Sequence, residues 1–272
     1  MTSMAARPKL MVNALAHYTS LAIFAAICLL WNVVALPMLL LLPARLGERC
    51  GRLGILVGYR LYVWSLSLMG LYRLDLRALQ ALRRGPPMVL APNHPSLIDA
   101  LMLIAHEPRV ACVMKSSLMN NVLIGPGARL ARYIRSTPTL RMIHEAVAEL
   151  RRGGLVLLFP EGTRTTRAPI NELQAGVGII AREARVPVQT LIIETDSPIL
   201  SKGWSPFRHG AFPVTYRIRL GRRFEPPDDV REFMAELDRY FRSELAQAAQ
   251  NQWIDARPPA AARPKPKPLP FA

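Results

Sequence analysis

The hydrophobic pattern of this chain changes early. Residues 21–43 form an uncharged, almost wholly apolar run of 23 residues, which as a helix is long enough to cross a hydrocarbon core of about 30 Å. A second apolar stretch, residues 55–71, contains Arg60 and several aromatic side chains, a composition typical of helices at a membrane interface. The pattern therefore predicts that residues 1–72 are membrane-associated helices.

The topology of this N-terminal segment stays open. Basic residues flank the first apolar run on both sides, so the positive-inside rule does not orient it. A helix that spans the bilayer and a re-entrant hairpin that is kinked at Pro37 both fit the sequence. A cleaved signal peptide fits less well, because the run is long and no small-residue cleavage site follows it.

From residue 87 onward, short apolar runs alternate with longer amphipathic ones, a pattern typical of βα units around a sheet. Residues 73–253 are therefore predicted to form one α/β domain, with helices that flank a mostly parallel sheet. The proline- and alanine-rich residues 254–272 are predicted to be disordered. We expect strands at 88–91, 110–114, 155–159, 188–193 and 214–220, and helices at 96–105, 139–151, 173–185 and about 228–253.

The charge of the chain limits its partners. The formal net charge is +16, with thirty arginines and five lysines, and such a field favours a polyanionic partner. The basic residues are scattered and no aromatic nucleic-acid motif accompanies them, so we expect lipids and not nucleic acid. The three cysteines form no CxxC pair and lie near no histidine cluster, which predicts reduced thiols and no metal site.

A histidine stands where the first predicted strand of the domain ends. Residues 93–99 read NHPSLID, at the carboxyl end of a strand, where α/β sheets place their ligands. From the turn that follows, Asp99 can orient the imidazole of His94 so that its other nitrogen takes a proton from a hydroxyl. The same residues fit a capping box with Ser96 as the N-cap, and the spacing alone does not separate the two interpretations.

A second polar cluster follows the apolar strand LVLLF. Residues 159–164 read FPEGTR, and we expect them at the same edge of the sheet as His94, where two converging polar clusters indicate a site. Gly162 permits a tight turn, and the guanidinium of Arg164 suits a phosphate or a carboxylate. Glu161 is expected to hold that arginine or to contact an acceptor, with a surface salt bridge as the alternative.

Together, NHPSLID and the later FPEGTRT resemble the paired signature of the glycerolipid acyltransferase family, typified by bacterial lysophosphatidic acid acyltransferases. The resemblance covers roughly residues 85–195. It implies an α/β acyltransferase with acyl-CoA or acyl carrier protein as donor, a lysophospholipid as acceptor, and no metal or redox cofactor. It also implies catalytic roles for His94 and Asp99, and binding of the acceptor phosphate by Glu161, Gly162, Thr163 and Arg164.

The chain departs from the family pattern outside these two motifs. Where the family usually has an aspartate–arginine pair, this chain keeps an arginine, Arg135, without the acidic neighbour. Lys115 follows a predicted strand and is expected to help neutralise a phosphate, with a solvated lysine as the alternative. The polar and aromatic segment 194–204 is expected either to shape a different acceptor pocket or to form a surface loop.

We therefore expect an O-acyltransferase that converts 1-acyl-sn-glycerol-3-phosphate to phosphatidic acid. The same chemistry on another lipid acceptor of a specialised pathway, an aryl polyene or an amino-acid-derived lipid, is the first alternative. A nonenzymatic membrane protein that binds anionic lipid or nucleic acid is the second. The expected location is a bacterial inner membrane, with the catalytic domain facing the cytoplasm.

Overall fold

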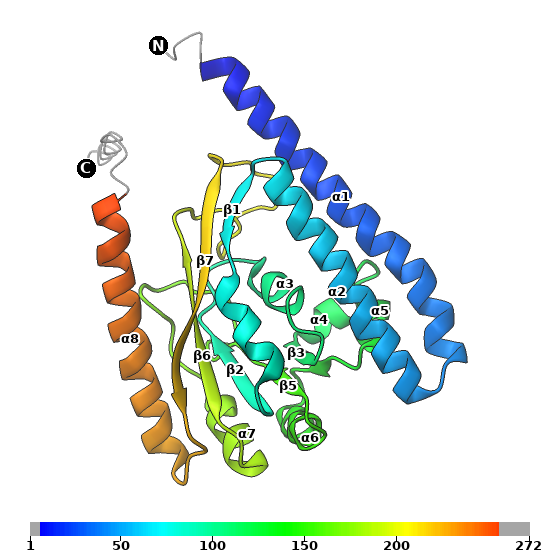
Figure 1. The fold of residues 1–272 in the computed structure, drawn as a ribbon, viewed down its shortest axis with the longest axis vertical. Coiled ribbons are helices and arrows are strands. Elements are labelled where there is room, and N and C mark those ends of the chain that lie inside the picture. The colour runs from blue at the N-terminus through cyan, green and yellow to red at the C-terminus, as the bar shows by residue number, and fades with distance from the viewer. Residues whose placement is uncertain (1–5, 256–272) are drawn as a thin grey trace, which may run out of the picture.

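The fold is built on a mixed sheet of seven strands. The computed structural model describes residues 6–255, and its strands lie in the order β1-β7-β6-β2-β5-β3-β4 (Figure 1). β6, β2, β5, β3 and β4 are mutually parallel, whereas β7 is antiparallel to β6 and parallel to β1. The predicted α/β class with a mostly parallel sheet is confirmed. The strands are β1 (Tyr72–Asp75), β2 (Met88–Pro92), β3 (Val110–Met114), β4 (Ile134–Arg135), β5 (Leu155–Leu157), β6 (Val188–Thr195) and β7 (Val214–Phe224).

Helices cover both faces of the sheet. In β2, Met88 and Leu90 belong to the core on one face and Val89 and Ala91 to the core on the other, because successive strand residues point to opposite faces. Burial on both faces explains the continuous apolar runs of the inner strands. The first face packs against α2 (Ala44–Leu68), α3 (Asp99–Ile104), α5 (Gly125–Leu130) and the 3-10 helix η1 (Arg77–Arg84), and the second against α6 (Thr139–Arg151), α7 (Gly176–Ala184) and α8 (Val230–Asp255).

Two predicted helices begin later than their apolar patterns indicate. The helix predicted at 96–105 begins at Asp99, because the Ser96 hydroxyl donates to the carbonyl of Ile199 at 3.3 Å and caps no helix. The helix predicted at 173–185 begins at Gly176, after the chain has bonded back to the 159–164 segment. In both places contacts with a distant loop override the local pattern.

The remaining differences concern element ends and short elements. α6 and β3 have their predicted bounds, whereas β5 ends earlier and β6 and β7 end later than predicted. Asp229 accepts from the N–H groups of Arg231 and Glu232 at the start of α8, as its position indicated. The sequence pattern missed β1, β4, η1, α5 and the short α4 (Ser116–Met119). The predicted disordered tail lies outside the described residues.

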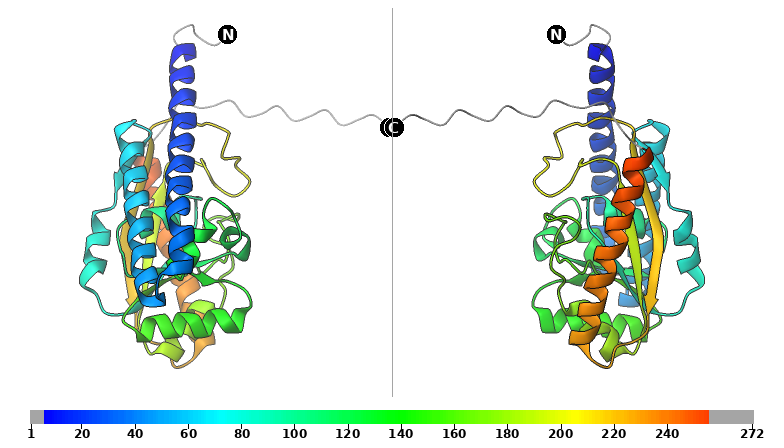
Figure 2. Two further views of the ribbon diagram at one scale, coloured as in Figure 1. Left: turned by 90° about the vertical axis from the view of Figure 1, so that its right-hand side faces the viewer. Right: turned by 90° about the vertical axis from the view of Figure 1, so that its left-hand side faces the viewer.

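The N-terminal segment is a pair of long helices that lie side by side (Figures 1 and 2). α1 (Ala6–Leu41) continues through Pro37, and the chain reverses at Pro43, so the turn between the two helices is not at Pro37, where the hairpin alternative had its kink. Residues Met11–Leu41 form the one stretch of the described chain that is long and apolar enough to cross a membrane. Its most apolar window has a mean hydropathy of 2.4 and is only 17% buried. α1 is thus a candidate for membrane association.

α2 joins this hairpin to the α/β domain. Its inward face is buried in the first core, and the Arg60 Nε donates to the carbonyl of Ala105 at 2.7 Å. The stretch that we predicted to be interfacial therefore packs on the domain through one face. On its other face, α2 exposes a row of apolar side chains, which includes Leu53, Leu61, Trp64 and Leu68.

Candidate active site

His94 and Asp99 meet beyond the carboxyl end of β2. His94 lies in the turn after β2, and Asp99 is the first residue of α3. The Nδ1 of His94 lies 2.7 Å from the Oδ2 of Asp99, whose side chain is fully buried, while that of His94 is 16% exposed. Among the described residues, the other ring nitrogen, Nε2, has no hydrogen-bond partner. The carboxylate therefore orients an imidazole that keeps one nitrogen for a ligand.

Three donors surround the carboxylate of Asp99. Its Oδ2 accepts from His94 and from the N–H of Ser96 at 2.8 Å, and its Oδ1 accepts the hydroxyl of Tyr216. Burial raises the pKa of Asp99, and these three hydrogen bonds oppose the rise. Burial also raises the pKa of Tyr216 well above its ordinary value, so that its hydroxyl stays protonated. One carboxylate thus accepts from the Ser96 N–H and orients His94, whereas Ser96 itself is not the N-cap of α3 that the capping-box interpretation required.

The imidazole and its turn are held from two further sides. The ring of His94 stacks on Phe159, with 3.8 Å between the ring centroids and 23° between the planes. The side chain of Asn93 donates to the carbonyl of Ile193 at 2.9 Å and accepts from its N–H at 2.7 Å. β6 and the segment that follows β5 therefore fix the position of what we call the histidine loop, residues 93–99.

Glu161 locks the second motif onto the first. Its buried Oε1 accepts from the N–H of His94 at 2.9 Å and from the hydroxyl of Thr165 at 2.8 Å, and its Oε2 accepts from the N–H of Asn171 at 3.0 Å. The N–H of Thr165 donates in turn to the carbonyl of His94 at 2.7 Å. The predicted convergence of the two clusters on one edge is confirmed. Of the alternatives given for Glu161, the contact with Arg164 is not formed, because both carboxylate oxygens have other partners.

Residues 159–165, which we call the arginine loop, present a guanidinium beside the histidine. Gly162 has a φ of +64°, a backbone conformation that favours glycine. The Nη1 of Arg164 donates to the carbonyls of Leu200 and Ser201, at 2.8 Å each. Among the described residues its Nε and Nη2 have no protein partner. This edge of the guanidinium can bind two oxygens of a phosphate or carboxylate side by side.

Lys115 and Arg135 lie at the same edge of the sheet but farther away. Lys115 follows β3, two strands from β2, and Arg135 ends β4, three strands from β2, or about 14 Å at roughly 4.8 Å per strand. The guanidinium of Arg135 contacts the Ser116 carbonyl at 3.5 Å and the Asn120 side chain at 3.2 Å. The structure thus joins five of the predicted site residues around His94 in two bonded loops and leaves these two apart.

Three residues of this region were not among the predicted site residues, although Lys202 lies in the segment 194–204 that was expected to shape an acceptor pocket or to form a surface loop. Phe159 is the first residue of the arginine loop and stacks on His94, and Lys202 donates to the Thr163 hydroxyl at 2.8 Å. Tyr216 reaches Asp99 from the antiparallel strand β7. The alternation of apolar residues at 214, 216 and 218 marks Tyr216 as inward-facing, but it carries no information on which polar group the hydroxyl meets.

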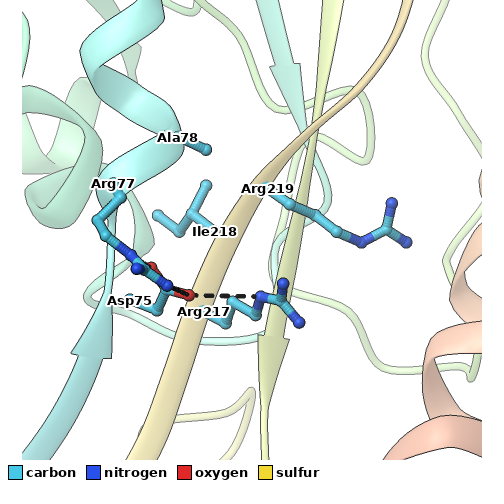
Figure 3. A pocket seen from close by; sticks show the side chains of 6 residues that line it. All are labelled: Asp75, Arg77, Ala78, Arg217, Ile218 and Arg219. Atoms are coloured by element: carbon cyan, nitrogen blue, oxygen red, sulfur yellow. Dashed lines mark hydrogen bonds and ion pairs between the residues drawn. The ribbon is translucent and has the colours of Figure 1, made fainter.

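A separate recess of about 320 Å³ lies between β1, η1 and β7 (Figure 3). Asp75 pairs there with Arg77 at 2.9 Å and with Arg217 at 3.6 Å. The other residues that line the recess are Ala78, Ile218 and Arg219. The histidine and arginine loops do not line this recess, so it is not part of the site around His94.

Known proteins resemble this chain in sequence and in fold. The sequence pattern of the family described as Acyltransferase matches residues 73–194. The human 1-acyl-sn-glycerol-3-phosphate acyltransferase beta is 24% identical over 208 residues, which cover 72% of each chain. The 1-acyl-sn-glycerol-3-phosphate acyltransferase of Pseudomonas aeruginosa is 23% identical over 185 residues, 66% of this chain and 70% of the relative.

The fold has a counterpart among solved structures. The crystal structure of the 1-acyl-sn-glycerophosphate (LPA) acyltransferase PlsC from Thermotoga maritima superposes with a TM-score of 0.65. The superposition covers 92% of this chain and 98% of the Thermotoga maritima chain. The two sequences are 15% identical, so the likeness shows a shared fold and no more. The matched domain contains both the histidine loop and the arginine loop. This chain is an acyltransferase: its residues 73–194 match the acyltransferase family, and it is similar in sequence to the 1-acyl-sn-glycerol-3-phosphate acyltransferases.

Proposed function

We propose that this enzyme transfers a fatty acyl group from the thioester of acyl-CoA or acyl carrier protein to the free hydroxyl of a lysophospholipid. The proposed acceptor is 1-acyl-sn-glycerol-3-phosphate, and the product is phosphatidic acid. The observation that carries this proposal is the junction of the two loops, which holds a histidine base beside a guanidinium with a free edge. The names of the relatives support the same acceptor.

The proposed reaction is a direct transfer. With its Nδ1–H donated to Asp99, His94 has a lone pair on Nε2 that removes the proton of the acceptor hydroxyl as the oxygen attacks the thioester carbonyl. The C–O bond forms, the C–S bond breaks, and the imidazolium returns the proton to the departing thiolate. The buried charge of Asp99 stabilises the imidazolium in between.

A covalent acyl-enzyme is not part of the proposal. The cysteine of the α/β domain, Cys112, is buried on β3, and burial raises the pKa of its thiol to about 12, which disfavours the thiolate that a nucleophile requires. We likewise propose that the transfer uses no metal or redox cofactor, since the thioester is already activated.

The free edge of Arg164 is the proposed docking point of the acceptor phosphate, with Glu161 and Gly162 shaping the loop and the Thr163 hydroxyl nearby. Lys115 and Arg135 are proposed as outer cations that help neutralise the phosphate. We place the enzyme at a bacterial inner membrane with its α/β domain facing the cytoplasm, since the exposed apolar surface of α1 suits a bilayer.

The test is acyl transfer by the purified, detergent-solubilised protein, with radiolabelled acyl-CoA or acyl carrier protein as donor and lysophosphatidic acid as acceptor. His94→Ala should lower turnover roughly 10²- to 10⁴-fold through loss of the general base. His144→Ala, which changes an exposed histidine on α6, is the matched control and should keep full activity. Undiminished turnover in His94→Ala would overturn the mechanism, and no product from the intact protein with either donor would overturn the acceptor.

A further inference from the structure

The loop between β6 and β7 contacts both site loops. We call residues 196–213 the strap; it is the yellow loop beside α1 in Figure 2. The N–H of Leu97 donates to the carbonyl of Leu200 at 3.0 Å. The Nη1 of Arg164 donates to the same carbonyl and to that of Ser201. The strap therefore joins the histidine loop and the arginine loop through two successive residues.

The backbone of the strap is strained at this junction. Leu200 has a φ of +63°, and Gly203 a φ of +86°. Glycine adopts this left-handed region without cost, but a leucine does so only where its surroundings impose it. The two donors on the Leu200 carbonyl supply that constraint. Strain of this kind clusters at functional sites, which favours a functional role for the junction itself, at Leu200 and the residues next to it.

The other end of the strap is held by α1. The Nε2 of His17 lies 2.8 Å from the carbonyl oxygen of Pro206, and the hydroxyl of Tyr18 donates to the carbonyl of Phe207 at 3.0 Å. The strap is therefore held at Leu200 and Ser201 by the arginine loop and at Pro206 and Phe207 by α1, so the residues between these two points are fixed from both sides. Lys202 lies in this fixed part of the strap.

Lys202 is a cation without a counter-ion. Its Nζ lies 2.8 Å from the hydroxyl oxygen of Thr163, and in the described part of the chain no carboxylate pairs with it. In this arginine-rich protein, Lys115 and Lys202 are the two lysines of residues 73–253. Both lie beyond the carboxyl ends of strands, at the edge that holds His94. An unpaired ammonium here is available to an anionic ligand.

We propose that Lys202 binds the phosphate of the acyl acceptor together with Arg164 and Thr163. This inference rests on the proposed function. A phosphomonoester carries about −1.5 to −2 charges at pH 7, so the guanidinium of Arg164 neutralises it only in part, and the ammonium of Lys202 adds a positive charge at the arginine loop itself, besides the outer cations Lys115 and Arg135. The Thr163 hydroxyl accepts from Lys202 and keeps its own hydrogen for a phosphate oxygen. The strap thereby selects phosphomonoester lipids over uncharged or singly charged ones.

Coenzyme A also carries phosphate groups, so the test must separate the two sources. We would measure kcat and KM for lysophosphatidic acid at saturating acyl-CoA, and for acyl-CoA at saturating acceptor, in Lys202→Ala, Lys202→Arg and the intact enzyme. The matched control is Arg208→Ala, which removes a strap cation that stacks on Trp204 at 4.3 Å and does not touch the arginine loop. Thermal unfolding and vesicle co-sedimentation establish that each variant folds and binds lipid alike.

We expect Lys202→Ala to raise the KM for lysophosphatidic acid roughly tenfold, with kcat and the KM for acyl-CoA unchanged and with recovery in Lys202→Arg. An unchanged acceptor KM, a rise confined to the acyl-CoA KM, a fall in kcat alone, or an equal effect in Arg208→Ala would each overturn the inference while the intact enzyme still makes phosphatidic acid. An inactive intact enzyme would instead refute the proposed function on which it rests.

Discussion

The histidine loop and the arginine loop lie next to each other but are built in opposite ways. In the histidine loop the reactive group is held by a fully buried carboxylate that has three donors. In the arginine loop Glu161 is buried and satisfied, whereas Arg164 is half-buried and keeps unused donors. A proton-transfer group needs one fixed orientation, but an anion site needs donors that a ligand can still reach. The contrast indicates that chemistry and recognition are divided between the two loops.

The largest expected effect tests the histidine loop, whose reactive group is held in one orientation. Asp99→Asn removes the charge that stabilises the His94 imidazolium, and it no longer fixes the tautomer, so kcat should fall roughly 10²- to 10⁴-fold with little change in the acceptor KM. Steady-state kinetics measure both values. The matched control is Asp75→Asn on β1, in the recess away from the site. A variant that kept its kcat and lost acceptor affinity would reverse the assigned division.

The next largest effect tests the arginine loop, whose guanidinium keeps unused donors. Arg164→Ala should raise the KM for lysophosphatidic acid roughly 10- to 100-fold, because a charge-assisted, two-point contact with the phosphate is lost, while kcat changes much less. The control is Arg167→Ala, which removes an exposed arginine three residues farther along the chain. A loss that falls entirely on kcat would mean that the guanidinium acts on the reacting atoms and not on recognition.

The smallest effect refines the account of the histidine loop. Tyr216→Phe removes one donor from the Asp99 carboxylate and should lower kcat/KM roughly two- to tenfold. The Tyr216 hydrogen bond lowers the pKa of Asp99, so its loss raises that pKa. The acid limb of the pH–rate profile should therefore move to higher pH. The control is Tyr240→Phe on α8. If the acid limb of Tyr216→Phe does not move, or moves only as much as that of the control, Tyr216 does not influence the ionisation of Asp99.

The sequence predicted the parts of the fold that local pattern controls. The inner strands were found because both of their faces are buried, which leaves continuous apolar runs. The expected edge for His94 and Glu161 followed from the parallel strand ends. The late starts of α3 and α7 could not be predicted, because they depend on hydrogen bonds to distant loops. The same holds for β1, a strand of four residues that its pairing with β7 defines.

The site was predictable in its residue types and not in its connections. His94, Asp99 and Arg164 stand in recognisable local patterns, but the sequence left the partner of Glu161 open between Arg164 and an acceptor, and the backbone N–H groups that it binds were not among these alternatives. The contact of Tyr216 with Asp99 spans 117 positions of the chain. Such contacts are set by tertiary packing, and a single sequence contains no local signal for them.

The two hydrogen bonds between the backbone of His94 and the arginine loop have a consequence for the engineering of this enzyme. The backbone of His94 donates to the Glu161 side chain and accepts from the Thr165 N–H, so the main chain of the base is anchored by the recognition loop itself. A chimera that received a new recognition loop from another protein would also receive new supports for its base. The histidine loop and the arginine loop must therefore be exchanged together. A chimera acquires a new acceptor preference without losing the base only if it receives both loops.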